Sequence, residues 1–372
     1  MKKETKSNQR VIMLLTNGFA PDLRVYKEAV YLVKKGFAVT VFCWDRTASL
    51  PVIDEIDSIE IKRCPIPSIY GTGFHQLSAF FKFLLACRQY MRSVSCDYLH
   101  CTNLDAMLIS LFCKKSPACQ LVFDMREFFD NDTLAKYPFF VKRIAGYLCA
   151  RAKYVLYVNP LQIAHVNLHK REKYIYLPNY SEREKFNPIV HIQNEKIRVA
   201  YIGVVRHFQI LKTLLDECST LRDEVDVLIH GNGIDAERLR AYSEEIRYGL
   251  VTGMFDHQNV GALYANCDVA FCVYREDDAN EQRAYPTKLF EAISARCPII
   301  MQKGTLAAQF VHEHGIGFCV DWKEQGSIRA AIQKSVDNPE LLTSMRAQMD
   351  IIRAQYVWED VVPNMDLIFH LS

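Results

Sequence analysis

Short apolar runs alternate with longer segments of helical periodicity, and this alternation limits the fold more than any other feature. Residues 11–15 read as a buried strand, 23–35 as an amphipathic helix and 38–44 as a second strand. The same order returns with strands at 98–101, 121–124 and 155–158, and with helices at 104–113 and 140–152. Strands that alternate with helices predict an α/β fold whose parallel sheet is covered on both faces.

A second series of the same kind follows the segment 177–180. Its expected strands are 199–205, 225–229, 269–273 and 298–302. The segment 180–196 is polar and, with Pro178 before it and Pro188 within it, reads as a hinge. Since a domain commonly holds about 150 residues, the 372 residues predict two α/β domains, 1–182 and 183–355.

The charge is balanced overall and divided along the chain. The net charge is +2, from 45 basic and 43 acidic residues, which argues against a protein that wraps nucleic acid. Residues 1–182 hold 25 basic and 16 acidic residues, or +9, and the remainder holds 20 and 27, or −7. The first half is therefore expected to face an anionic phospholipid surface or a phosphate-bearing acceptor, unless these are scattered solvated charges.

The spacing of the cysteines and the length of the apolar runs indicate the cellular compartment in which the protein is expected. The 13 cysteines include no CxxC pair, so we expect reduced thiols and no metal. The polar N-terminus lacks an apolar signal core and no run approaches the roughly 20 apolar residues that span a bilayer; we expect a cytoplasmic protein. The segment 74–92 is apolar nearly all round, which favours a buried helix over one lying on a membrane.

The stretch 231–236 matches the pattern GxGxxA, follows an expected strand and opens a helix, with Asp256 about 20 residues on. This is the fingerprint of a dinucleotide site, which would make the protein an oxidoreductase. It lies, however, in the second strand-helix unit of its domain. A glycine-rich turn at the carboxyl edge of a sheet is the other interpretation.

Several residues of the second half suit a nucleoside diphosphate. Arg206 and Lys212 can neutralise phosphates, the first through a bidentate fork and the second as a point charge. Pro286 can begin a helix whose free backbone N–H groups bind anions, and Glu291, one turn later, can accept hydrogen bonds from two ribose hydroxyls. Taken singly, each of these residues is better explained as a solvated surface charge, but together they describe a cradle for a nucleoside diphosphate.

In its motifs the chain resembles the family 4 glycosyltransferases. The matching stretches are 201–203 with Arg206 and Lys212, 229–233, Gly253 with 263–264 and 267–269, and 286–292 with 297–298. The resemblance implies the GT-B fold, two Rossmann-like domains with parallel sheets facing across a cleft, and a helix at 356–372 that packs back on the first domain. It implies a donor site made of Gly203, Arg206, Lys212, Gly231, Gly253, Thr287, Lys288 and Glu291, with no metal or other cofactor.

The first half resembles a subgroup that opens with Asp-x-Arg-Val-x-x-Glu-Ala, here residues 22–29, and further matches are 97–100, 123–127 and 177–179. The resemblance places Asp22, Arg24 and Glu127 on the acceptor side. Two positions depart from it. Arg126 replaces the histidine of Asp-x-His-Glu, so an active-site histidine must come from elsewhere, with His100 the nearest candidate, or is not needed. The candidate catalytic residues are therefore Arg206, Lys212 and His100. Arg283 stands where the first of two glutamates eight positions apart is usual, and Glu281 is out of register.

The resemblance implies a retaining, hexosyltransferase-type enzyme that moves a sugar from a nucleoside diphosphate to an acceptor hydroxyl. The acceptor would be a glycan or lipid-linked, in capsule, O-antigen or exopolysaccharide synthesis, with the enzyme at the inner face of the cytoplasmic membrane. Two alternatives stay open: a nucleotide-sugar 2-epimerase of the same fold, and a nucleotide-sugar binder without catalysis, which the two arginines at unusual positions favour.

Overall fold

The computed structural model describes residues 9–20, 22–68, 74–113, 115–128, 138–165, 171–186, 190–275 and 277–369. The chain divides into two compact units, Met1–Pro178 together with Val362–Ser372, and Asn179–Val361. The segment 180–196, expected to be a hinge, falls within the second unit, and Pro188 lies outside the described residues.

The first unit contains an eight-stranded sheet in the order β3-β4-β2-β1-β5-β6-β7-β8. Its strands are β1 (Arg10–Leu15), β2 (Ala38–Asp45), β3 (Ile53–Ile56), β4 (Ile59–Pro65), β5 (Tyr98–Thr102), β6 (Gln120–Met125), β7 (Tyr154–Tyr157) and β8 (Tyr174–Tyr176). All neighbours are parallel except β3, which pairs antiparallel with β4. The strand order reverses between β1 and β5, which makes this a topological switch point.

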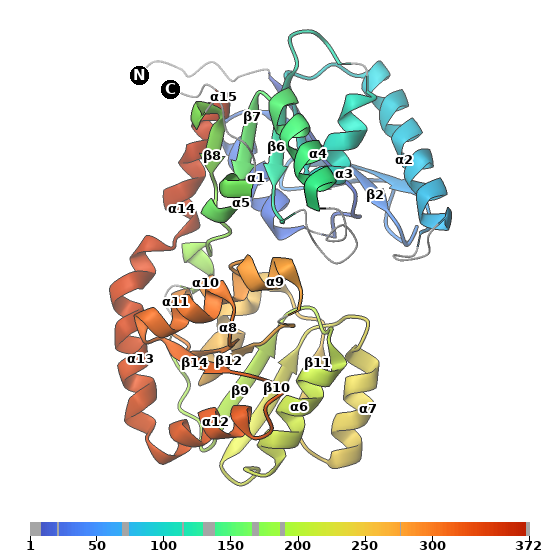
Figure 1. The fold of residues 1–372 in the computed structure, drawn as a ribbon. Coiled ribbons are helices and arrows are strands. Elements are labelled where there is room, and N and C mark those ends of the chain that lie inside the picture. The colour runs from blue at the N-terminus through green and yellow to red at the C-terminus, as the bar shows by residue number, and fades with distance from the viewer. Residues whose placement is uncertain are drawn as a thin grey trace. The chain divides into compact units, whose positions relative to one another are not determined.

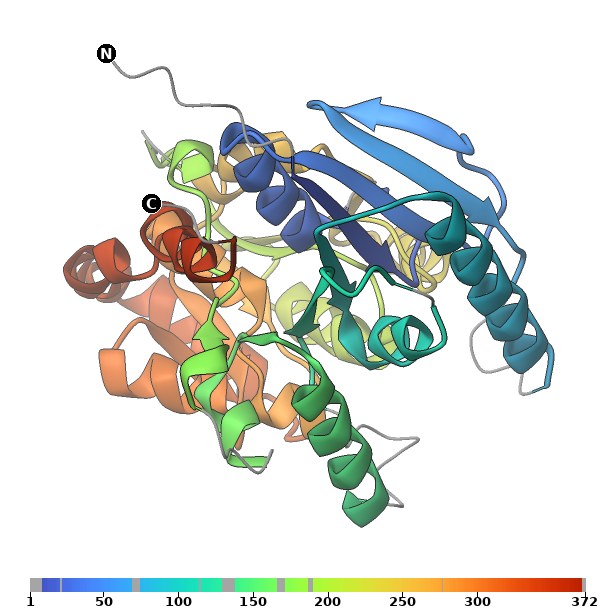
Figure 2. The same cartoon turned by 90° about the horizontal axis from the view of Figure 1, so that it is seen from above.

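The helices of the first unit cover both faces of this sheet. They are α1 (Leu23–Lys34), α2 (Phe74–Ser93), α3 (Asn103–Leu111), α4 (Pro138–Arg151), α5 (Pro160–His165), η1 (Arg171–Lys173), η5 (Val362–Met365) and α15 (Asp366–Phe369). Right-handed crossovers put α1 on one face and α2, α3 and α4 on the other (Figure 2). The side chain of Asp22 caps α1 by accepting a hydrogen bond from the backbone N–H of Val25.

The expected helix at 356–372 is wrong in length. The structure has α14 (Trp358–Val361) in the second unit, then η5 and α15 in the first, while residues 370–372 lie outside the described part. Pro363 helps to explain the break, because a proline lacks the backbone N–H that a continuous helix needs. In the first unit, Phe369 packs on Phe37 and Tyr98, with ring centroids 5.3 and 4.7 Å apart.

The second unit contains a six-stranded, all-parallel sheet in the order β11-β10-β9-β12-β13-β14 (Figure 1). Its strands are β9 (Ile197–Ile202), β10 (Val225–His230), β11 (Leu250–Gly253), β12 (Val269–Cys272), β13 (Ile299–Gln302) and β14 (Gly317–Val320). This is the strand order of the Rossmann fold, with its switch point between β9 and β12.

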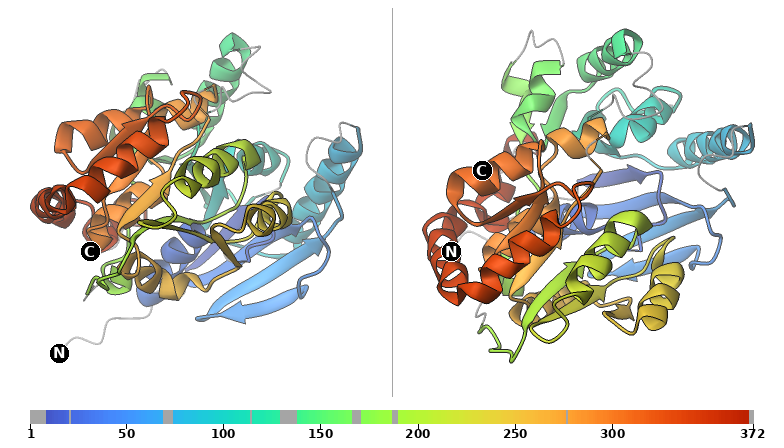
Figure 3. Two further views of the ribbon diagram at one scale, coloured as in Figure 1. Left: turned by 90° about the horizontal axis from the view of Figure 1, so that it is seen from below. Right: turned by 60° about the horizontal axis from the view of Figure 1, so that its bottom comes forward.

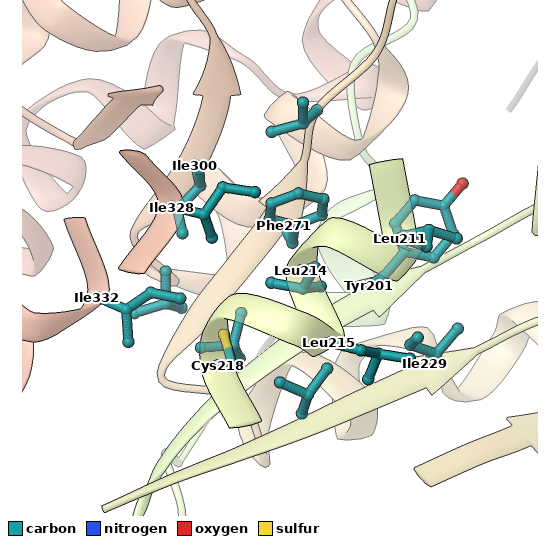
Figure 4. Packing of buried hydrophobic residues seen from close by; sticks show 14 of the residues in the cluster. Tyr201, Leu211, Leu214, Leu215, Cys218, Ile229, Phe271, Ile300, Ile328 and Ile332 are labelled. Atoms are coloured by element: carbon teal, nitrogen blue, oxygen red, sulfur yellow. The ribbon is translucent and has the colours of Figure 1, made fainter. Parts of the chain in front are cut away.

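The helices of this unit are α6 (Phe208–Ser219), α7 (Ala236–Ile246), α8 (Val260–Ala265), α9 (Ala279–Arg283), α10 (Thr287–Ala295), α11 (Leu306–His314), α12 (Ser327–Asp337) and α13 (Pro339–Ile352), with η2 (Arg183–Phe186), η3 (His257–Asn259) and η4 (Arg353–Gln355). α6, α7 and α12 lie over one face (Figure 3). There Leu211, Leu214 and Leu215 of α6 pack on Tyr201, Ile229 and Phe271 of the sheet (Figure 4). α8, α10 and α11 pack against the other face.

Candidate active site

Three glycine-containing loops meet at the carboxyl edge of the second sheet. Gly203 follows β9 and Gly231 follows β10, with φ of 142° and 141°, values that favour glycine. The N–H of Gly203 donates to the carbonyl of His230 over 2.8 Å, and that of Gly231 donates to Gly253 over 2.7 Å. A Cβ on Gly231 would collide with the carbonyl oxygen of Gly203. Gly231 therefore allows close contact between loops, a use that also accounts for the glycine-rich turn at 231–236.

Lys288, in the first turn of α10, lies beside Gly203. Its Nζ is 3.7 Å from the ring centroid of Tyr201 and 5.3 Å from that of Tyr274, so the ammonium faces two aromatic rings. A Cβ on Gly203 would lie 2.6 Å from Cε of Lys288. The glycine therefore leaves the space that the lysine occupies. No side chain caps α10 after Pro286, so its first backbone N–H groups are free to meet an anion.

Arg206 and Glu281 form a second charged group near this helix. The Nη2 of Arg206 lies 3.3 Å from Oε1 of Glu281, and its guanidinium is 5.7 Å from the ring of Tyr274. The same Oε1 is 3.3 Å from Nε2 of His207, while Oε2 accepts a 2.8 Å hydrogen bond from the N–H of Arg275. Arg206 is 51% exposed. Its guanidinium can thus turn to an anion, and Glu281 would keep its contacts with His207 and the N–H of Arg275.

Two predicted donor residues are engaged elsewhere. Lys212 pairs with Asp216 over 2.5 Å on its own helix and lies 4.5 Å from the ring centroid of Tyr242 on α7. Glu291 is buried, with Oε1 3.1 Å from Nε2 of His257 and Oε2 accepting a 3.2 Å hydrogen bond from the Tyr264 hydroxyl. In this structure both side chains thus have partners of their own.

Buried charges gather in the first unit, where the sequence placed the acceptor. The guanidinium of Arg24 donates to both carboxylate oxygens of Asp124, over 2.8 and 3.0 Å, and to the carbonyl of Leu177 over 2.8 Å. Its Nε is also 2.9 Å from Oε1 of Glu28, whose Oε2 lies 3.3 Å from Nε2 of His100. All four ionisable side chains are 3% exposed or less. Arg24 and His100 are thus enclosed rather than presented to a substrate.

The pKa values in this cluster follow its geometry. Burial, together with the negative charge of Asp124, raises the pKa of Glu28. Burial also disfavours the charged form of Asp124, but the guanidinium of Arg24 outweighs it and the pKa of Asp124 is well below its ordinary value. Oxygen and nitrogen atoms of Glu28, His100 and Asp124 lie within 4.8 Å of one another. Arg24 contacts both carboxylates and supplies the positive charge that a metal ion would bring, so this group does not fit a metal site.

Arg126 extends the cluster toward solvent. Its two Nη atoms donate to the two carboxylate oxygens of Asp22 over 2.7 and 2.9 Å, a bidentate pair. Although burial favours the neutral acid, this pairing lowers the pKa of Asp22. Arg126 is 17% exposed, so it is the most accessible cation of the cluster. Glu127, the third acceptor-side residue, is exposed at the end of β6.

Residues 182–350 match the family model described as "Glycosyl transferases group 1". This match lies within the second unit, Asn179–Val361. No curated protein matches the chain by sequence. The group 1 assignment rests on the same unit that contains Gly203, Arg206 and Lys288.

Solved structures resemble the whole chain. Sucrose-phosphate synthase from Thermosynechococcus elongatus has a TM-score of 0.74 at 14% identity, covering 98% of each chain. WaaG, a glycosyltransferase involved in lipopolysaccharide biosynthesis, has a TM-score of 0.69 at 13% identity, and the match covers 97% of this chain and 100% of WaaG. Anabaena Alr3699/HepE in complex with UDP-glucose has a TM-score of 0.66 at 12% identity, and the match covers 98% of this chain and 99% of that chain. At such identities the likeness shows the fold, which is GT-B.

Sequence reasoning located the edge of the second sheet but missed several of its residues. Glu281, set aside as out of register, is the carboxylate nearest Arg206. Tyr274, one of the two rings that flank Lys288, lies in none of the quoted motifs, and Tyr201, the other, lies in the stretch 201–203 but was given no role. Gly253 ends β11 beside Gly231, and Thr287 is exposed at the start of α10. Glu28 and Asp124 lie in quoted motifs, but only the fold shows that they enclose His100.

Proposed function

We propose that this protein transfers a sugar from a nucleoside diphosphate to an acceptor hydroxyl with retention. The observation that carries the proposal is the group at the switch point of the second sheet. Arg206, Lys288 and the uncapped start of α10 gather beside a glycine that keeps the backbone open. Ligands of open α/β sheets bind at such a point.

The proposed chemistry follows from where negative charge develops. Breaking the bond between sugar and phosphate leaves charge on the diphosphate, and groups fixed near that charge lower the barrier most directly. Arg206 and Lys288 supply positive charge, and Lys212 joins them if it exchanges Asp216 for a phosphate. We include no metal ion, because these cations can carry the neutralising role.

The finer points of the proposal rest on the resemblance and on the comparisons together. We propose a hexosyl donor, since Alr3699/HepE binds UDP-glucose, and an acceptor in cell-surface polysaccharide synthesis, since WaaG acts in lipopolysaccharide biosynthesis. The basic first unit suits a lipid-linked acceptor at an anionic membrane surface. Among the described residues, no helix is both long and apolar enough to cross a bilayer.

Transfer is tested by incubating the full chain with UDP-, GDP- and dTDP-sugars and a lipid extract from the source cells, and by measuring free nucleoside diphosphate and labelled glycolipid. We expect diphosphate release that depends on the extract, with a product of retained anomeric configuration. Conversion of the donor sugar without use of an acceptor would indicate the epimerase. Donor binding without turnover of any kind would indicate a non-catalytic binder.

A further inference from the structure

Helix α2 carries an apolar stripe that the fold does not bury. Leu77, Phe81 and Leu85 are 50%, 55% and 60% exposed, and their spacing of four residues puts them on one side of the helix. The opposite side, with Ala79, Phe83, Cys87 and Met91, packs into the core of the first unit. The sequence predicted a buried helix because both sides are apolar. The structure uses only one of them for the core.

The charged side chains of α2 itself are all positive. α2 contains no Asp or Glu, and its three basic residues, Lys82, Arg88 and Arg92, are exposed. α4 lies on the same face of the sheet (Figure 2) and also contains no acidic residue, while its basic residues Lys142, Arg143 and Arg151 are exposed.

An aromatic ring accompanies these charges on α4. Tyr147 is 54% exposed there, with the guanidinium of Arg151 5.9 Å from its ring centroid. This face of the first unit therefore combines apolar side chains, an amphipathic aromatic ring and cations. That is the composition of a helix surface that lies in the headgroup region of a bilayer.

We propose that this face, α2 with α4, binds the surface of an anionic phospholipid bilayer, with Leu77, Phe81 and Leu85 inserted at the level of the headgroups. Charge complementarity favours this occupant over a second copy of the chain, because two such faces would bring like charges together. The proposal deepens the membrane contact within the proposed function and rests on it, whereas the binding itself requires no donor or transfer.

The test uses the full chain and sedimentation with vesicles of phosphatidylcholine, alone or mixed with phosphatidylglycerol. We expect binding to the mixed vesicles that weakens with added salt. Phe81→Ser with Leu85→Ser should weaken it by about tenfold or more, because the inserted apolar area is lost. Arg88→Gln with Arg92→Gln should weaken it by roughly 25-fold, at about fivefold for each basic residue near the surface.

The matched control is Leu161→Ser with Leu367→Ser, which removes two apolar side chains, 40% and 65% exposed, from the same unit but on α5 and α15 rather than on α2 or α4. It should bind vesicles as the wild type does. Absence of wild-type binding, equal binding to neutral vesicles, or an equal loss in the control would overturn the proposal. So would a dimer in solution that dissociates in the Phe81→Ser, Leu85→Ser variant, since a second copy would then be the occupant.

The failure of this proposal can be told from failure of the proposed function. Nucleotide binding in the second unit is measured without vesicles, by thermal shift. A variant of α2 that keeps its nucleotide shift but loses vesicle binding is folded and separates the two properties. Vesicle binding by a wild type that binds no nucleotide would leave the surface assigned and the sugar transfer rejected.

Discussion

Replacing Gly203 by alanine tests how the donor site is built. Two effects are expected. The φ of 142° is unfavourable for a residue with a Cβ, and such strain costs about 1–3 kcal/mol of stability. The new Cβ would also lie 2.6 Å from Cε of Lys288, so that the lysine must leave its place beside Tyr201. A charged hydrogen bond is worth about 1.5–3 kcal/mol, and its loss should weaken binding of a nucleoside diphosphate by about 10- to 100-fold.

The matched control is Gly304→Ala, because Gly304 also has a positive φ, 81°, but has nothing within 4 Å of an added Cβ. It should lose stability in urea unfolding and keep its nucleotide affinity. Lys288→Met should lose affinity as Gly203→Ala does, and the double variant should lose little more, since both act on one contact. Wild-type affinity in Gly203→Ala, or additive losses in the double variant, would refute the reasoning.

Three further predictions concern the buried cluster and the donor site. Asp124→Asn leaves the guanidinium of Arg24 without its bidentate partner, and it should lower the free energy of unfolding measured in urea by about 3–5 kcal/mol. The control Asp360→Asn, in a pair more than half exposed, should leave the unfolding midpoint unchanged. Similar unfolding curves for both variants would contradict the burial argument. Because the pKa of Asp22 is lowered in the folded protein, this carboxylate contributes stability at a pH above its ordinary pKa of 3.8, and the contribution is lost as the pH falls below that value. Asp22→Asn should therefore flatten the acid limb of a profile of stability against pH. An unchanged acid limb would count against the pair with Arg126. Arg206→Ala should reduce turnover by about 10²- to 10³-fold with unchanged urea unfolding, and near-normal turnover would remove Arg206 from the mechanism.

Periodicity and motifs predicted the α/β alternation, because each buried strand and each amphipathic helix leaves a local pattern. They did not predict β3 and β4, a hairpin at the edge of the first sheet. The strand β3 lacks a continuous apolar run, and its side chains alternate between exposed and half-buried. The strands of the second sheet were easier to predict, since motifs fall at the carboxyl ends of β9 and β10.

Side-chain partners could not be predicted, because they depend on which elements the fold brings together. Arg24 and Asp124 are 100 residues apart in sequence and meet only across β6 and α1. Lys212 has the residue type expected for a phosphate, yet Asp216 one turn away holds it in this structure. α2 shows the same limit, since its two apolar sides look alike until the sheet covers one.

The central claim, a nucleoside diphosphate site at the edge of the second sheet, is tested most directly by a thermal-shift screen with UDP, GDP, dTDP, CMP and NAD. A ligand that binds only the folded protein raises its apparent stability, by about 2.7 kcal/mol at 100 times Kd. We predict a shift with one nucleoside diphosphate that is lost in Arg206→Ala and kept in Arg183→Ala, an arginine 57% exposed in the same unit. A shift with NAD alone, or no shift with any of the five, would contradict the claim.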